Sequence, residues 1–391
     1  MSEPSAPPPR DLIVVGASAG GVEAIRQIVA ALPAGFAGAV CVVLHIPAQA
    51  PSVLPRILGR ASVVPCVPAE DGMALEAGRV YVAPPDHHLL VEPGRLHVVR
   101  GPRENGHRPA VDPLFRSAAR SYGARVVGVV LSGNLDDGTR GLREVVRRGG
   151  VGVAQDPEGA AFPGMPKSAV AYGHAHHVVP VDQIGPLLAR LAEGGDAGRA
   201  PEDAPVAHRS ASSTDDRSAG DGAPEARPDP ALAGGNGAPG SAATSDAERD
   251  AIIRLTDLTA ADGRINAGAE VNERLGGVVS AFTCPECHGA LWELRDGELA
   301  RYRCRVGHSY SERSLVEHKT HSLEDALWTA LTALEESAAI AQRAAERAAE
   351  GGRPHSAEQY RRRAERIEER SRLLRDVLGT LPATAPGPDD A

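Results

Sequence analysis

The sequence predicts a doubly wound α/β domain at residues 11–193, built on a mostly parallel sheet. Two observations support this prediction. Short apolar runs have the length of buried strands, and glycine-containing turns lead from them into helical patterns. The runs are Asp11–Val15, Ala39–Leu44 and Arg125–Leu131. Strands that alternate with helices form parallel sheets with helices on both faces, which is the fold class that we expect.

Three short strand patterns interrupt this alternation at Val80–Ala83, Leu89–Glu92 and Leu96–Val99. Pro93-Gly94 separates the last two and is typical of a turn, so we expect a small antiparallel excursion here. The pattern at Val111–Tyr122 then predicts a helix that returns the chain to the main sheet.

Composition and charge exclude several classes of protein. The 391 residues suit two or three units, and 42% of them are hydrophobic, which is enough for a core. A net charge of −9 argues against general nucleic-acid binding. The first ten residues do not have the pattern of a signal peptide, and no apolar run approaches the roughly 18 residues that cross a bilayer. We therefore expect a cytoplasmic protein without membrane insertion.

The segment Gly16-Ala17-Ser18-Ala19-Gly20 lies between a predicted strand and the helical pattern Val22–Ala31. A G-x-S-x-G sequence at a strand-to-helix turn is the arrangement of a nucleophile elbow, which exposes the serine hydroxyl beside backbone N–H donors. A turn shaped by packing alone is a second interpretation. A phosphate-binding turn is a third and less favoured one, because the spacing is not G-x-G-x-x-G and no Gly-Lys-Ser/Thr follows.

Two further polar groups follow predicted strands directly. His45 comes after one apolar run, and Asp136 and Asp137 follow another. Each has a simpler explanation, since such a histidine is often structural and Asp-Asp-Gly often caps a helix. However, the carboxyl ends of parallel strands meet at one edge of a sheet, so we expect Ser18, His45 and one aspartate to lie together. The combination favours acyl transfer on a serine.

Several blocks in the first half of the chain resemble the catalytic domain of the chemotaxis receptor methylesterase CheB. In chain order they are Ile13–Ala24, Val43–Pro47, Gly78–Leu89, Arg108–Phe115, Leu131–Gly138 and Ala154–Lys167. The resemblance implies hydrolysis of glutamyl methyl esters on chemoreceptors with release of methanol, and extends to deamidation of receptor glutamines. It implies methylated chemoreceptor cytoplasmic domains, or another methylated signalling protein, as partners, and no cofactor for catalysis.

The same resemblance implies the roles of three residues: Ser18 as nucleophile, His45 as base and Asp137 as carboxylate, with Asp136 as the alternative carboxylate. The chain departs from the family at one point. The family usually has Met-Gly-x-Asp-Gly before its helix, and the methionine helps to form the oxyanion hole. Asn134 stands at that methionine position here. A backbone donor would survive the exchange, whereas a packing role would not.

CheB of the familiar kind also carries an N-terminal receiver domain that is controlled by phosphorylation. Only ten residues precede the first predicted strand here, so we expect no receiver domain. This leaves an alternative function open. The chain could be a non-chemotactic signalling protein that uses the CheB-like fold and its C-terminal module for partner binding, with little turnover.

A second chemical signal follows a stretch at 194–245 that we interpret as a flexible linker, because Gly, Ala, Pro, Ser and Asp dominate it. The unit at 246–318 contains C-x2-C and C-x3-H pairs separated by sixteen residues. Their members are Cys284, Cys287, Cys304 and His308. Two such pairs predict a closed, zinc-ribbon-like structural zinc site. Three unrelated buried thiols and a surface histidine are the alternative.

The C-terminal segment at 319–379 predicts a helical hairpin. Ser322 and Asp325 have the spacing of a capping box at the start of the first helix. Gly351–Pro354 breaks the pattern, and Ser356–Leu378 continues as a second helix. Packing of the two helices against each other is the simplest interpretation, and a docking or dimerisation surface is the alternative.

Overall fold

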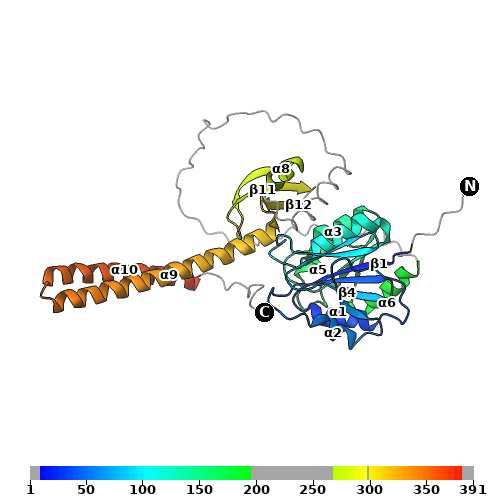
Figure 1. Ribbon diagram of the computed structural model, residues 1–391, viewed down its shortest axis with the longest axis horizontal. Helices are drawn as coiled ribbons and strands as arrows, with labels where there is room; N and C mark the ends of the chain where they lie inside the picture. Colours follow the sequence, from blue (N-terminus) through cyan, green and yellow to red (C-terminus); the bar gives the residue numbers. More distant parts are fainter. Residues whose placement is uncertain (1–8, 195–266, 297–298, 381–391) are drawn as a thin grey trace, which may run out of the picture.

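The computed structural model describes residues 9–194, 267–296 and 299–380 (Figure 1). The N-terminal part is built on a seven-stranded sheet of order β3-β4-β2-β1-β7-β8-β9, in which every pairing is parallel. Its strands are β1 (Leu12–Ala17), β2 (Ala39–Leu44), β3 (Cys66–Pro68), β4 (Arg79–Val82), β7 (Val126–Val130), β8 (Val151–Gln155) and β9 (His177–Val179). The predicted doubly wound fold is confirmed.

Helices cover both faces of this sheet. They are α1 (Gly21–Ala30), α2 (Leu54–Gly59), α3 (Val111–Tyr122), α4 (Thr139–Arg147), α5 (Gly164–Tyr172) and α6 (Val181–Ala192), with a 3₁₀ turn at Gly123–Arg125. Ile13 and Val15 pack in one core with α1, α2 and α6, while Leu12 and Val14 pack in the other with α3, α4 and α5. Successive side chains of a strand point to opposite faces, so a continuously apolar strand serves both cores.

The predicted antiparallel excursion is smaller than expected. Two of the three segments form an antiparallel hairpin, β5 (His88–Glu92) with β6 (Arg95–Val99). The segment Val80–Ala83 was expected to join them, but most of it forms β4, which pairs in parallel with β2 in the main sheet. Its side chains are buried on both faces, which is the pattern of a central parallel strand rather than of a surface hairpin.

The C-terminal part contains a second, antiparallel sheet of order β10-β11-β12-β13. Its strands are β10 (Val278–Thr283), β11 (Ala290–Asp296), β12 (Leu299–Cys304) and β13 (Ser309–Ser311), preceded by α8 (Ala267–Arg274). Two long helices follow, α9 (Glu312–Glu350) and α10 (Pro354–Thr380), and they pack as a hairpin that extends away from both sheets (Figure 1). The predicted linker at 194–245 lies outside the described residues except for Gly194.

The start of the helical hairpin differs from the prediction. Helix α9 begins at Glu312, where the Ser311 hydroxyl accepts a hydrogen bond from the Ser314 N–H at 3.1 Å and caps the helix. Ser322 is therefore no cap: it lies inside the helix, and its hydroxyl donates to the His318 carbonyl at 2.9 Å. Ser311 and Ser322 both precede amphipathic sequence, so the local pattern does not distinguish them. Tertiary contacts with Asp136 and Asn105 hold Ser311 at the start of the helix.

Among the helices that the structure describes, none is long and apolar enough to cross a bilayer.

The first glycine of the G-x-S-x-G turn brings strand β1 and helix α3 into close approach. A Cβ atom at Gly16 would lie 2.2 Å from Val111 Cγ1, far inside contact distance. We expect Gly16→Ala to lower the free energy of unfolding by about 1–3 kcal/mol, because a well-packed core does not accept an added methyl group. Chemical denaturation of the purified variant measures this change.

Gly59→Ala is the matched control for this substitution. Gly59 is exposed at the end of α2, and a Cβ there would lie 4.0 Å from its nearest neighbour, Cys66 Cβ. We expect no loss of stability in this variant, since alanine is favoured over glycine in helices. Equal stability of the Gly16 and Gly59 variants would contradict the packing argument.

Candidate functional site

Two of the predicted site residues follow neighbouring strands at the same edge of the sheet. Ala17 and Leu44 are register partners in the β1–β2 pair, and Ser18 and His45 come directly after them. The His45 N–H donates to the Ala17 carbonyl at 3.1 Å, which continues the pairing past the end of β2. The predicted convergence of Ser18 and His45 at one rim therefore follows from strand register alone.

The turn that carries Ser18 is held against the end of β7. The Ser18 N–H donates to the Ser132 carbonyl at 2.9 Å, and a Cβ at Gly133 would lie 2.9 Å from Ser18 Cβ. Gly20 has φ 73°, a left-handed conformation that glycine adopts without steric cost, and it caps α1. This sharp turn leaves the Ser18 side chain half-buried at the rim.

His45 and Asp137 form the central contact of the site. The His45 Nε2 and Asp137 Oδ2 atoms are 2.8 Å apart, and the two side chains are 5% and 3% exposed. The other imidazole nitrogen, Nδ1, is buried without a hydrogen-bond partner among the described residues. Because Nε2 is bonded to Asp137 and Nδ1 has no partner among the described residues, the Ser18 hydroxyl makes no hydrogen bond to the His45 ring. The structure thus joins two of the three predicted residues directly and leaves the third beside them.

Asp137 is a buried carboxylate that accepts several hydrogen bonds. Besides His45, its donors are the N–H groups of Val111 at 2.6 Å, Gly138 at 3.0 Å and Asp112 at 3.3 Å, and the side-chain amide of Asn105 at 3.0 Å. Burial alone would raise the pKa of Asp137, but the hydrogen bonds from His45 and Val111 outweigh it and lower the pKa to about 2. Asp137 is therefore ionised at neutral pH.

The neighbouring aspartates have different surroundings. Asp136 accepts a hydrogen bond from the Ser311 hydroxyl at 2.7 Å, and burial raises its pKa. Asp112 accepts from the Gly141 N–H at 2.7 Å, and burial together with the Asp137 charge raises its pKa to about 7. Of the two aspartates that the sequence left open, the one in contact with His45 is Asp137.

Sequence reasoning missed two residues of the site, Asn105 and His107. Asn105 donates to Asp137, and the His107 ring stacks on His45 with centroids 3.6 Å apart and an angle of 14° between the planes. Burial and the neighbouring His45 lower the pKa of His107 well below its usual value, which favours a neutral ring. The Asn105-Gly106 pair is a turn signal, but nothing in the sequence indicates where that turn packs.

The loop after β7 passes beside Ser18. Its Ser132 and Gly133 N–H groups are already bonded, to Gln155 Oε1 at 3.0 Å and to the Phe162 carbonyl at 2.9 Å. Asn134, at the family's methionine position, is exposed. Leu135, where the family pattern has glycine, adopts φ 59°, a conformation that costs a non-glycine residue about 1–2 kcal/mol.

The four predicted metal ligands lie together at one end of the second sheet. Their ligand atoms are all within 4.8 Å of one another, so the cluster can bind a metal ion. Cys287 Sγ and Cys304 Sγ are 3.6 Å apart, and each of Cys284 Sγ and Cys304 Sγ lies 3.6 Å from His308 Nδ1. Metal–sulfur bonds of about 2.3 Å in a tetrahedron place sulfur atoms about 3.8 Å apart, close to this spacing.

A carboxylate lies behind the histidine of this cluster. Glu286 Oε2 is 3.2 Å from His308 Nε2, the ring nitrogen that faces away from the thiols, and Glu286 Oε1 accepts a hydrogen bond from the Tyr310 hydroxyl at 2.8 Å. Such a carboxylate fixes the tautomer that leaves Nδ1 free to bind a metal. The donor set therefore fits a closed, four-ligand site.

The fold and the rim define a class: a doubly wound α/β protein with serine, histidine and aspartate at the carboxyl ends of its central strands. The family model of the CheB methylesterase matches residues 13–188. A putative protein-glutamate methylesterase/protein-glutamine glutaminase of Leptospira interrogans is 36% identical over 182 residues, which are 46% of this chain and 94% of that protein. The chain belongs to the CheB methylesterase family.

A second relative and one solved structure are each similar to about half of this chain. Protein-glutamate methylesterase FrzG of Myxococcus xanthus is 39% identical over 187 residues, which are 48% of this chain and 56% of that protein. The crystal structure of the Thermotoga maritima CheB methylesterase catalytic domain is 34% identical, covers 46% of this chain and 98% of its own, and has a TM-score of 0.45. The chain spans about half the length of the first curated relatives that it matches.

The lowered pKa of Asp137 predicts a specific acid sensitivity. A carboxyl with a folded pKa of about 2 and an ordinary pKa of about 3.9 stabilises the fold above about pH 4, and this contribution is lost as the pH falls toward 2. We expect the wild type to lose about 2 kcal/mol more than Asp137→Asn between pH 5 and pH 2. Urea unfolding at a series of pH values measures the difference.

Asp136→Asn is the control, because the pKa of Asp136 is shifted in the opposite direction. A raised folded pKa means that ionisation destabilises the fold as the pH rises, so removing this group should not reduce the loss of stability in acid. The assignment of the buried charge to Asp137 is wrong if the two variants respond to acid in the same way.

Proposed function

We propose that this protein is a serine esterase that hydrolyses glutamyl methyl esters on chemoreceptors, releasing methanol, and that also deamidates receptor glutamines. The observation that carries the proposal is the buried His45–Asp137 contact beside Ser18 at one rim of the sheet. The names of the relatives support it, since they are protein-glutamate methylesterases and protein-glutamine glutaminases.

In the first step Ser18 attacks the ester carbonyl. A serine hydroxyl is a weak nucleophile at its ordinary pKa, so a base must take its proton during the attack. With Nε2 of His45 occupied by Asp137, the imidazole proton belongs on Nε2, and Nδ1 carries the lone pair that accepts the Ser18 proton. Attack requires the Ser18 side chain to turn toward Nδ1, which is free to receive it.

The remaining steps use the same groups. His45 returns the proton to the departing methanol, and water then attacks the acyl-enzyme with His45 again as base. Asp137 holds the imidazole tautomer and stabilises the transient imidazolium by its charge, and it stays ionised throughout. For glutamine the leaving group is ammonia instead of methanol.

The oxyanion that forms during attack needs backbone donors beside Ser18. The N–H groups of Ser18, Ser132 and Gly133 are already bonded elsewhere. Within the described residues, the N–H groups of Ala19 and Asn134 have no such acceptor, and both lie in the loops that flank the serine. We assign these two N–H groups to the oxyanion hole, where one donor contributes about 2.7–4 kcal/mol. A backbone donor at Asn134 preserves this role without the family's methionine.

Ser18→Ala tests the nucleophile. We expect it to lower methanol release by more than about 10⁴-fold, because the loss of one member of a hydrolytic triad removes nearly all of its contribution. The substrate is a methylated chemoreceptor fragment with a labelled methyl group, and the fold is checked by its denaturation midpoint. Unchanged turnover in a folded Ser18→Ala sample would refute the esterase proposal and favour a partner-binding signalling protein.

The carboxylate is tested by a pair of variants on adjacent residues. Asp137→Asn should lower turnover by about 10⁴-fold, since the amide cannot hold the productive tautomer. Asp136→Asn should lower it far less, because the hydrogen bond to His45 is made by Asp137, while the Asp136 carboxylate accepts from the Ser311 hydroxyl. The opposite ranking would assign the role of the carboxylate to Asp136 instead of Asp137.

We also propose that the cluster of Cys284, Cys287, Cys304 and His308 holds a structural zinc ion. Four protein ligands leave no open position for water, so the site stabilises the fold and takes no part in hydrolysis. We expect one zinc ion per chain in the purified protein, and loss of this zinc in Cys284→Ser. Cys66→Ser, which changes a thiol outside the cluster, should keep it. A metal-free wild-type protein with the second sheet folded would contradict the proposal.

A further inference from the structure

One turn of the N-terminal domain lies between the rim and the C-terminal part of the chain. In this 104–107 turn, Glu104 and His107 exchange backbone hydrogen bonds at 3.2 and 2.9 Å. On one side, Asn105 donates to Asp137 and His107 stacks on His45. Both members of the His45–Asp137 pair are therefore contacted by a single short turn.

On its other side, the 104–107 turn is held by β13 and the start of α9. The Asn105 N–H donates to the Ser309 carbonyl at 2.6 Å, and His318 Nε2 lies 3.3 Å from the Asn105 carbonyl. The Asn105 side-chain oxygen accepts from the Ser311 N–H at 2.9 Å and from the Ser314 hydroxyl at 3.0 Å. Asn105 itself has φ 51°, so these contacts hold a conformation that is uncommon for a non-glycine residue.

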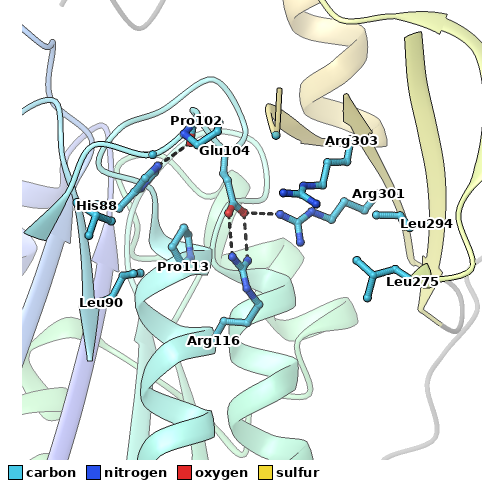
Figure 2. A pocket seen from close by; sticks show the side chains of 13 residues that line it. His88, Leu90, Pro102, Glu104, Pro113, Arg116, Leu275, Leu294, Arg301 and Arg303 are labelled. Carbon is cyan, nitrogen blue, oxygen red and sulfur yellow. Dashed lines mark hydrogen bonds and ion pairs between the residues drawn. The ribbon is translucent and has the colours of Figure 1, made fainter. Parts of the chain in front are cut away.

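A buried ion cluster fastens the two parts together next to this turn. The Glu104 carboxylate binds Arg116 of α3 at 2.8 Å and Arg301 of β12 at 2.7 Å (Figure 2). Burial alone would raise the pKa of Glu104, but the two guanidinium charges outweigh it and hold the pKa far below its usual range. A cavity of about 40 Å³ lies beside the cluster, and residues of both parts line it, among them His88, Arg116 and Leu294.

The Asn105 side-chain amide contacts both Asp137 at the rim and the C-terminal part of the chain. An amide has an oxygen that accepts and an NH₂ group that donates, and the two ends are not interchangeable. Two donors from the C-terminal part, the Ser311 N–H and the Ser314 hydroxyl, fix the oxygen. The NH₂ group is thereby turned toward Asp137 Oδ1. With the amide reversed, its oxygen would face the carboxylate, and two acceptors would repel each other.

We propose that Asn105 is a positioning residue for the hydrolytic reaction, and that the C-terminal part of the chain sets its orientation through Ser311 and Ser314. The C-terminal part is then a component of the esterase rather than a separate module. This inference rests on the proposed function, because Asn105 acts through Asp137 and His45 and does not touch the reacting atoms.

The test compares Asn105→Ala, Ser314→Ala and the double variant in the full chain. Ser371→Ala is the matched control: it is a buried serine on α10 whose hydroxyl donates to a carbonyl of its own helix, as Ser322 does on α9, and it lies away from the turn. The first readout is the rate at which Ser18 reacts with a fluorophosphonate, which forms a Ser18 O–P bond with loss of fluoride and needs no receptor. The second is the low-field proton NMR signal of the His45 Nε2–H.

We expect Asn105→Ala to slow the labelling of Ser18 about 10-fold, the effect of one hydrogen bond to a charged group. Ser314→Ala should slow it about 3-fold, because the Ser311 N–H still holds the amide. The double variant should match Asn105→Ala alone, since the serine acts only through the amide. The low-field signal should shift in both single variants, and kcat on methylated receptor should fall while KM changes less than about 2-fold.

Three results would overturn the inference: labelling of Asn105→Ala within about 2-fold of the wild type, Ser314→Ala indistinguishable from Ser371→Ala, or fully multiplicative effects in the double variant.

Failure of the proposed function gives different results in the labelling and methanol-release assays. If wild-type Ser18 is labelled but no methanol is released, the receptor substrate is wrong and the inference stands. If Ser18 is not labelled at all, the NMR signal alone decides whether Asn105 orients the His45–Asp137 pair.

Discussion

The buried charge of Asp137 is the constraint on which the site depends. An ionised carboxylate at 3% exposure is stable only when donors replace the water that it has lost. Here the donors come from four places in the chain: the end of β2, the 104–107 turn, the start of α3 and the residue after Asp137 itself. Each donor must arrive at the same point, so the surrounding backbone has little freedom to move.

The packing of the sheet brings these donors close to the Asp137 carboxylate. Gly16 lets Val111 approach β1, and the Val111 N–H is then 2.6 Å from the Asp137 carboxylate. The register of β1 and β2 sets Ser18 beside His45, and the Ser18–Ser132 backbone bond ties the serine turn to the strand that leads to Asp137. Core residues and rim residues are thus linked through the backbone, and the chemistry of the rim depends on the apolar cores below it.

Much of this arrangement could be predicted from the sequence because it follows from local patterns. Apolar runs indicate buried strands, and a residue that follows a parallel strand must lie at its carboxyl edge, which is why Ser18, His45 and one of Asp136 and Asp137 could be named together. The choice of Asp137 rested on the resemblance to the CheB family. The spacing of the thiols and His308 likewise identified a cluster. The role of Asn105 could not be predicted, since its partners Asp137 and Ser314 are 32 and 209 positions away. The start of α9 was missed for the same reason: Ser311 is held by Asp136.

Helix α9 connects distant parts of the molecule without interruption. Its 39 residues correspond to a rod about 58 Å long, and the residue that caps its start, Ser311, contacts Asp136. Because each turn is bonded to the next, the two ends of such a rod cannot swivel independently. A force applied to the outer end of the hairpin would therefore be transmitted along α9 to its start, where Ser311 contacts Asp136.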